Sequence, residues 1–113
     1  MGSLKELQQE VEAFVTENDL VCSADVRLLD LQSELGELAK AQLKSTNYGR
    51  WSHRDDIPSG WMDELGDVLF SLVALANIDD IDLEDCLKAS IKKYKARIDS
   101  YGDAGSKKNK PVK

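Results

Sequence analysis

Apolar residues recur every three or four positions in three stretches of the chain, the spacing that places side chains on one face of an α-helix. A fourth stretch, beyond Asp67, is apolar nearly all round, which predicts a buried helix. We find no alternating pattern long enough for a useful β-strand. The sequence therefore predicts an all-α bundle of four to five helices. The three periodic stripes are Leu4, Leu7, Val11, Phe14 and Val15; Leu28, Leu31, Leu35 and Leu38; and Leu83, Leu87, Ile91, Tyr94 and Ile98.

Polar residues with capping chemistry mark where these helices begin and end. Ser3 opens a capping box in SLKE, and Ser23 and Asp82 have the side chains that favour a helix start. Glycine past the end of a helix favours a stop. The expected helices run from Ser3 to about Asn18, from Ser23 to an end between Ser45 and Gly49, from about Trp61 to Asn77, and from Asp82 to Gly102.

The length and the charge distribution suggest one folded domain and a tail. The chain has 113 residues, which fits a single helical domain over residues 1–102. Residues 103–113 contain little to bury and four lysines, so we expect a disordered basic tail. Residues 1–106 hold the other eleven bases and all 21 acids, and this acidic body argues against duplex nucleic acid as a partner.

Membrane and secretion signals are not evident. The longest uncharged run, residues 68–78, is too short to cross a bilayer, which needs about 20 residues. Cys22 and Cys86 are far apart and form no metal-binding spacing, so we expect reduced thiols and a cytoplasmic location.

Two short segments, SELGELA and DELGDVL, repeat the pattern acid-Leu-Gly-acid inside predicted helices. Glycine inside a helix costs about 1 kcal/mol relative to alanine, and acids three apart repel each other. Such spacing is common in an acidic chain, but these two pairs border the most apolar segments. Carboxylates from neighbouring helices of a bundle commonly bind metal. We therefore predict that Glu34, Glu37, Glu64 and Asp67 bind a hard cation, Mg²⁺ or also Mn²⁺, because every donor is oxygen.

The glycines of these segments agree with that interpretation. Gly36 and Gly66 each lie between two acids, where a missing side chain allows a helix backbone or a bulky ligand to approach. An alternative is structural, since glycines are common at helix crossings and acids often form a solvated edge. In a metal-assisted hydrolysis, a carboxylate not fully engaged with metal could orient the attacking water, and Glu34 or Glu37 could do so.

ELGELAKA and DELGDVLFSLVALAN, with 26 residues between Glu37 and Glu64, resemble the MazG-like all-α nucleoside triphosphate pyrophosphohydrolases. Their signature is ExxE, a spacer, and ExxD, and the four predicted ligands match it. The resemblance implies a Mg²⁺-dependent enzyme that cleaves a nucleoside triphosphate between the α and β phosphates. The products would be a nucleoside monophosphate and pyrophosphate. It also implies a homodimer or homotetramer, and basic and aromatic residues near the phosphates on the last helix, here Lys93, Tyr94 and Arg97.

Several other residues are candidates for substrate contact. Lys40 follows Glu37 by about one helical turn and could reach phosphate, or could pair with nearby acids. The loop segment RWSHR, residues 50–54, could close over a base, with Trp51 stacking on it and the arginines meeting phosphate. Trp51 could equally be a packing anchor at a subunit interface.

Two alternatives to the favoured activity remain at this point. The first is a non-catalytic helical oligomer that binds structural metal. The second keeps the fold and changes the substrate, for example to phosphoribosyl-ATP.

Overall fold

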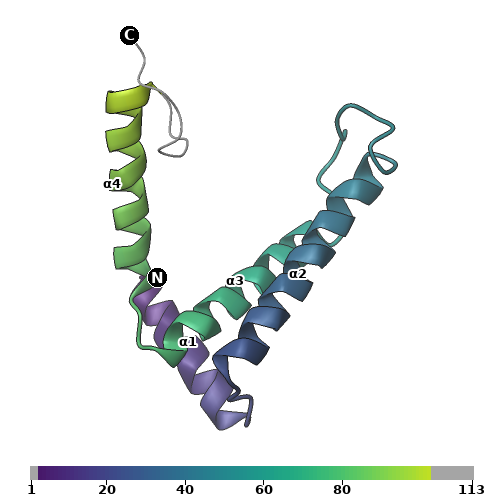
Figure 1. Cartoon of the computed structure of the whole chain (residues 1–113). Helices are drawn as coiled ribbons and strands as arrows, with labels where there is room; N and C mark the ends of the chain where they lie inside the picture. Colours follow the sequence, from purple (N-terminus) through teal and green to yellow (C-terminus); the bar gives the residue numbers. More distant parts are fainter. Residues whose placement is uncertain (1–2, 103–113) are drawn as a thin grey trace. The chain divides into compact units, whose positions relative to one another are not determined.

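The computed structural model describes residues 3–102, which form four α-helices and their connections. The helices are α1 (Leu4–Glu17), α2 (Ala24–Ser45), α3 (Trp61–Ile78) and α4 (Leu83–Tyr101) (Figure 1). Residues 3–102 contain no strand, so the predicted all-α class and its helix positions are confirmed. The predicted tail, residues 103–113, lies outside the described residues.

The helix ends have the caps that the sequence indicates. Ser3 and Glu6 form a reciprocal capping box, and these hydrogen bonds lower the pKa of Glu6. Ser23 and Asp82 accept backbone N–H bonds at the starts of α2 and α4. Gly102 ends α4 with a φ of 82°, a left-handed conformation that glycine adopts without strain. Local chemistry therefore accounts for the starts of α1, α2 and α4 and for the end of α4.

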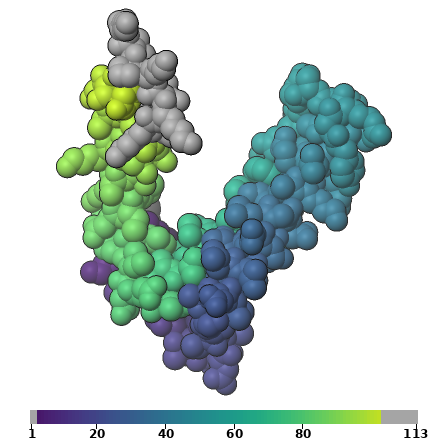
Figure 2. All heavy atoms as spheres, viewed as in Figure 1, coloured from purple at the N-terminus to yellow at the C-terminus, as the bar shows by residue number. Residues whose placement is uncertain are grey.

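The chain divides into two compact units, Met1–Ile81 and Asp82–Lys113. In the first, α2 and α3 run side by side in opposite directions, joined by residues 46–60, and make the most extensive helix contact (Figure 1). Figure 2 shows the atoms of α2, in blue, on the visible face of this unit. The helix α1 packs against α3. In the second unit α4 has no buried residue, and its apolar stripe is exposed.

The core of the first unit is small and lies on one side of α3. Val73, Ala74 and Ala76 are the buried apolar residues of the described chain, and Ser71 is buried beside them. Leu69 and Leu72, on the same helix, are exposed by 50% and 39%. Within a single chain α3 is therefore buried on one side, because only α1 and α2 pack on it in this unit. The all-round apolar pattern predicts that another subunit covers the rest of α3, and this stays a prediction.

A polar network ties α1 to the end of α3. Gln8 is 6% exposed, and its Nε2 donates to Asn77 Oδ1 at 3.1 Å and to the Ile81 carbonyl at 2.9 Å. Asn77 Nδ2 donates to the Gln8 carbonyl oxygen at 2.9 Å. Because both partners are shielded, removing one leaves polar groups that water cannot fully satisfy. The α1–α3 contact thus depends on hydrogen bonds as well as on apolar packing.

We predict that Asn77→Ala lowers the free energy of unfolding by about 1–3 kcal/mol, because it removes two part-buried hydrogen bonds between α1 and α3. Urea denaturation followed by circular dichroism measures the change. Asn18→Ala is the matched control, since Asn18 forms an exposed hydrogen bond to the Phe14 carbonyl, and it should cost less than about 1 kcal/mol. Equal losses in both variants would contradict the role assigned to Asn77.

Two further findings concern membrane-spanning segments and the two cysteines. None of the described helices is long and apolar enough to cross a bilayer. Cys22 and Cys86 are both free thiols. The cytoplasmic location stays a prediction.

Candidate metal centre

The antiparallel contact between α2 and α3 brings acidic residues of the two helices face to face. Side chains three and four residues apart share one face of a helix, so each helix presents a polar stripe. Because the helices run in opposite directions, the stripes meet in reverse order. The facing pairs are Asp30 with Ser71, Glu34 with Asp67, and Glu37 with Glu64.

Three of the four predicted ligands converge. Glu34, Glu64 and Asp67 each have one carboxylate oxygen within 4.8 Å of the others. Glu34 and Glu64 are half-buried, whereas Asp67 is exposed. Glu37 is exposed and lies outside this group of three, although its charge acts on Glu64. The structure therefore separates three close carboxylates from a fourth at their margin.

The convergence disfavours the charged form of two of these acids. The pKa of Glu34 is raised from its ordinary value of 4.5, first by desolvation and then by the charges of Asp67, Glu64, Asp30 and Glu37. The pKa of Glu64 is raised from 4.5 by desolvation, and next by Asp67 and Glu37. Like charges brought together in a partly desolvated place repel, and a cation would relieve the repulsion.

One oxygen of this group has no hydrogen-bond partner. Glu64 Oε2 is shielded from solvent and accepts no hydrogen bond. Buried polar atoms are nearly always satisfied, so an unsatisfied carboxylate oxygen within an acidic cluster is typical of a place that takes a ligand. With three oxygen donors, Glu34, Glu64 and Asp67 fit a hard divalent cation such as Mg²⁺, which prefers carboxylate and water ligands.

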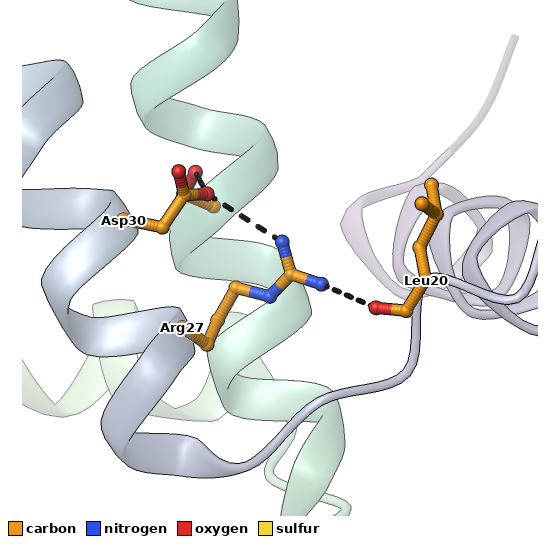
Figure 3. A network of polar contacts seen from close by, with 4 residues as sticks. Leu20, Arg27 and Asp30 are labelled. Atoms are coloured by element: carbon orange, nitrogen blue, oxygen red, sulfur yellow. Dashed lines mark hydrogen bonds and ion pairs between the residues drawn. The ribbon is translucent and has the colours of Figure 1, made fainter.

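A hydrogen-bonded anchor lies one helical turn beyond the three carboxylates. Ser71 Oγ, on α3, donates to Asp30 Oδ2 on α2 at 3.0 Å. Arg27 Nη1 lies 3.5 Å from the same oxygen, and Arg27 Nη2 donates to the Leu20 carbonyl at 3.0 Å (Figure 3). This network ties the loop after α1 to α2 and α3. It fixes the register that places Glu34 opposite Asp67.

The space beside the two motif glycines is open. A Cβ atom added at Gly36 or Gly66 would meet no heavy atom within 4 Å. Within the described chain, no helix backbone therefore approaches either glycine closely. Of the two expected uses of these glycines, the approach of a ligand or of another molecule is the one compatible with this open space.

Other predicted contact residues lie on the surface of the first unit. Lys40 is exposed on α2, one turn beyond Glu37, and forms no ion pair within residues 3–102. Trp51, in the loop after α2, is 58% exposed. Both side chains are accessible, as a substrate contact requires, and their roles stay predictions.

The predicted phosphate-binding residues of α4 gather around one aromatic ring. Lys93 Nζ and Arg97 Cζ lie 5.0 Å and 5.8 Å from the ring of Tyr94. Cation–π contacts of this kind hold positive groups over an aromatic face. They belong to the second unit, so their assignment to the substrate also stays a prediction.

Asp30 was not among the predicted site residues, and Arg54 was predicted only as one of the two arginines of the loop segment RWSHR. Asp30 raises the pKa of Glu34 and accepts the Ser71 hydrogen bond. Its position four residues before Glu34, on the same helix face, was a signal in the sequence. Arg54 is half-buried, and its Nη1 has no hydrogen-bond partner. Nothing in the sequence distinguishes it from Arg50, because shielding of a loop side chain depends on the tertiary structure.

The MazG nucleotide pyrophosphohydrolase domain family matches residues 23–101 of this chain. The YpjD protein of Bacillus subtilis (strain 168) is 33% identical over 99 residues, covering 84% of this chain and 86% of YpjD. The YpjD crystal structure superposes with a TM-score of 0.67 and 32% identity, over 86% of this chain and 97% of that chain. A Bacillus-conserved MazG protein, described as a nucleotide pyrophosphohydrolase, gives a TM-score of 0.66 and 28% identity over 83% and 90% of the two chains.

The fold and the facing acidic stripes thus define an all-α hydrolase that acts on nucleotides. The chain belongs to the MazG nucleotide pyrophosphohydrolase domain family. The resemblance carried by the two acidic motifs is confirmed.

We predict that Glu64→Gln raises the melting temperature of the protein in EDTA at neutral pH, because it removes one of the repelling charges. Mg²⁺ should raise the melting temperature of the wild-type protein and have less effect on the variant. A raised folded pKa means that the charged form destabilises the fold. The advantage of the variant should therefore be present at neutral pH and vanish as pH falls through the raised pKa towards 4.5.

Glu10→Gln is the control, since Glu10 is an exposed glutamate in the middle of α1. It should leave the response to Mg²⁺ unchanged. Differential scanning fluorimetry in EDTA and in Mg²⁺ measures all three proteins. A Glu64→Gln protein that is destabilised and still gains the full wild-type stabilisation from Mg²⁺ would contradict the candidate metal centre.

Proposed function

We propose that this protein is a Mg²⁺-dependent nucleoside triphosphate pyrophosphohydrolase that cleaves the substrate between its α and β phosphates. The products are a nucleoside monophosphate and pyrophosphate, and Mn²⁺ can replace Mg²⁺. The observation that carries the proposal is the convergence of Glu34, Glu64 and Asp67 within 4.8 Å, with one Glu64 oxygen shielded and unpaired. Membership of the MazG family supports the class of reaction.

In this proposal Glu34, Glu64 and Asp67 hold the metal. The ion, when bound, supplies charge neutralisation for the phosphates and lowers the pKa of a bound water. The three carboxylates come from two helices whose register is fixed by the Asp30–Ser71 hydrogen bond, so their spacing is set before substrate binds. Preorganised charge of this kind stabilises a transition state without further rearrangement.

Glu37 is the better placed of the two predicted water-orienting residues. Glu34 belongs to the converging group, whereas Glu37 is exposed at its margin and its charge still reaches Glu64. A carboxylate oxygen of Glu37 then accepts a proton from the attacking water. The water oxygen bonds to phosphorus, and the bridging oxygen between the α and β phosphates leaves with the bonding electron pair.

Cations and aromatic rings on each of the two units are the proposed substrate contacts. Lys40 on α2 would bind phosphate oxygens, and the exposed ring of Trp51 would stack on a base. Lys93, Tyr94 and Arg97 of α4 form a ready-made cluster of two cations on one ring. Positive groups at these positions offset the repulsion between an acidic protein and an anionic substrate.

We expect the purified protein to convert nucleoside triphosphates to monophosphate and pyrophosphate with Mg²⁺, and to lose this activity in EDTA. Anion-exchange chromatography of a panel of bases and sugars measures the products. Glu37→Gln should lower kcat by about 10²–10⁴-fold, the usual contribution of a general base. Asp67→Asn should raise the Mg²⁺ concentration needed for half-maximal rate at least about 10-fold.

Circular dichroism should show that both variants remain helical. Release of diphosphate and orthophosphate would contradict the proposed bond cleavage. Stabilisation by Mg²⁺ with no turnover of any nucleotide, phosphoribosyl-ATP included, would instead favour a non-catalytic metal-binding oligomer.

The exposed apolar surface supports a proposal that the protein is a homodimer or homotetramer. Large apolar side chains on the two paired helices remain exposed, and exposed apolar surface of this kind commonly forms an interface. They are Leu28, Leu29 and Leu35 on α2, and Leu65, Leu69 and Leu72 on α3.

We predict a solution mass of two or four times the chain mass of 12.6 kDa, because burial of these leucines favours association. Size-exclusion chromatography with light scattering measures the mass. Leu69→Lys, which places a charge in the exposed apolar surface of α3, should shift the mass towards 12.6 kDa. A monomeric wild-type protein at micromolar concentration would contradict this prediction.

A further inference from the structure

Arg54, in the loop before α3, packs its side chain on an aromatic ring. Its Cζ atom lies 4.9 Å from the centroid of the Trp61 ring, close enough for a cation–π contact. The side chain is half-buried, and its Nη1 atom is shielded from solvent with no hydrogen-bond partner. The structure thus holds a guanidinium group in one place while leaving donors of that group unused.

A charged group with an N–H donor that lacks a hydrogen-bond partner is unfavourable unless a ligand accepts that hydrogen bond. A guanidinium group has five N–H donors in a rigid fork, and a buried charged donor without a partner loses the energy of its hydrogen bonds to water. Asp55 and Asp56 directly follow Arg54, yet Arg54 forms no ion pair within residues 3–102. A neighbouring acid was available in the sequence, and the fold does not use it.

The ring on which the Arg54 guanidinium packs lies one helical turn before the unpaired carboxylate of the candidate metal centre. Trp61, on which Arg54 stacks, begins α3, and Glu64 lies three residues further on the same face. The shielded atoms Arg54 Nη1 and Glu64 Oε2 have opposite charges and do not pair with each other. A metal ion would satisfy the carboxylate, and an anion would satisfy the guanidinium. A phosphate group with its bound cation supplies both.

We propose that Arg54 binds a phosphate group of the nucleotide, with Trp61 as the positioning residue that holds the guanidinium in place. This assignment rests on the proposed function, and it adds a substrate-binding residue to the same site. Arginine suits the role because its planar fork can donate two parallel hydrogen bonds to one phosphate and stack on a ring at the same time.

The two arginines of the loop segment RWSHR differ in this respect. Arg50 is exposed, and its Nη1 donates to Asn47 Oδ1 at 3.4 Å within the same loop. It has a local partner and water for its remaining donors. Arg54 has the ring contact and the shielded, unpaired donor. The proposal therefore concerns Arg54, and Arg50 serves as a control of equal charge in the same loop.

The experiment measures binding of an α,β-methylene nucleoside triphosphate, which cannot be cleaved at the α–β bridge, to the full-length protein with Mg²⁺. Isothermal titration calorimetry gives Kd for the wild type, Arg54→Gln, Arg54→Lys and Arg50→Gln. We expect Arg54→Gln to weaken binding by roughly 10- to 100-fold, the scale of a hydrogen bond to a charged group. Arg54→Lys should recover only part of this loss, because lysine lacks the planar fork. Arg50→Gln should change Kd less than about twofold.

Two further measurements separate phosphate binding from a structural role. The rise in melting temperature caused by Mg²⁺ without nucleotide should persist in Arg54→Gln, since Arg54 is not a metal ligand in this proposal. Pyrophosphate added as a competitor should inhibit the wild type more strongly than Arg54→Gln. If Arg54→Gln does not fold, Arg54→Lys decides the question by the same measurements.

The outcomes also separate this proposal from the function on which it rests. A wild-type protein that releases pyrophosphate, with Arg54→Gln binding the analogue equally well, overturns the role of Arg54 and leaves the proposed function intact. Equal losses in the Arg54→Gln and Arg50→Gln variants also overturn it, since they would reflect general charge. A wild-type protein that neither binds the analogue nor hydrolyses triphosphates overturns the proposed function and this assignment together.

Discussion

The antiparallel contact between α2 and α3 brings together carboxylates that repel one another. The convergence of these carboxylates and the raised pKa values of two of them depend on that contact. Glu34, Glu64 and Asp67 come from two helices and converge within 4.8 Å. Desolvation and mutual repulsion raise the pKa of Glu34 and Glu64, so this part of the helix pair opposes folding when it is fully charged. The rest of the first unit has to hold the helices together against this repulsion.

Two sets of polar contacts and a small core do so. At one end of the acidic stripe, Ser71 and Arg27 both bind Asp30, and Arg27 also binds the Leu20 carbonyl. At the end of α3, Gln8 and Asn77 join α1 to the same helix. The buried apolar residues between them are one valine and two alanines, which allow close packing of helices and contribute a modest apolar area. A fold with so little buried apolar surface depends on further burial, which supports the proposed assembly of several copies.

Groups of opposite charge around this contact form a pattern that suits a metal-bound polyphosphate. The acidic cluster has a shielded oxygen without a partner, and Arg54 has a shielded nitrogen without one. In an ordinary ion pair, each charge would satisfy the other. Here the shielded oxygen and the shielded nitrogen both remain without a partner, which distinguishes the site from such a pair. In α4, Lys93 and Arg97 gather on the Tyr94 ring and give the second unit a positive cluster of its own.

The sequence by itself determined the helices, their caps and the acidic motifs, because these depend on interactions between residues close together in the chain. The capping box at Ser3 and the stop at Gly102 are local, and the spacing of Glu34 and Glu64 with their partners follows from helical periodicity. The family resemblance rested on the same motifs and was confirmed. Only the tertiary structure decided which carboxylates meet, why Glu37 lies at the margin, and that Asp30 pairs with Ser71, since each depends on the register of α2 against α3. It also decided that α3 is buried on one side, because the pattern of apolar residues shows which faces avoid water and does not show whether the same chain or another covers them.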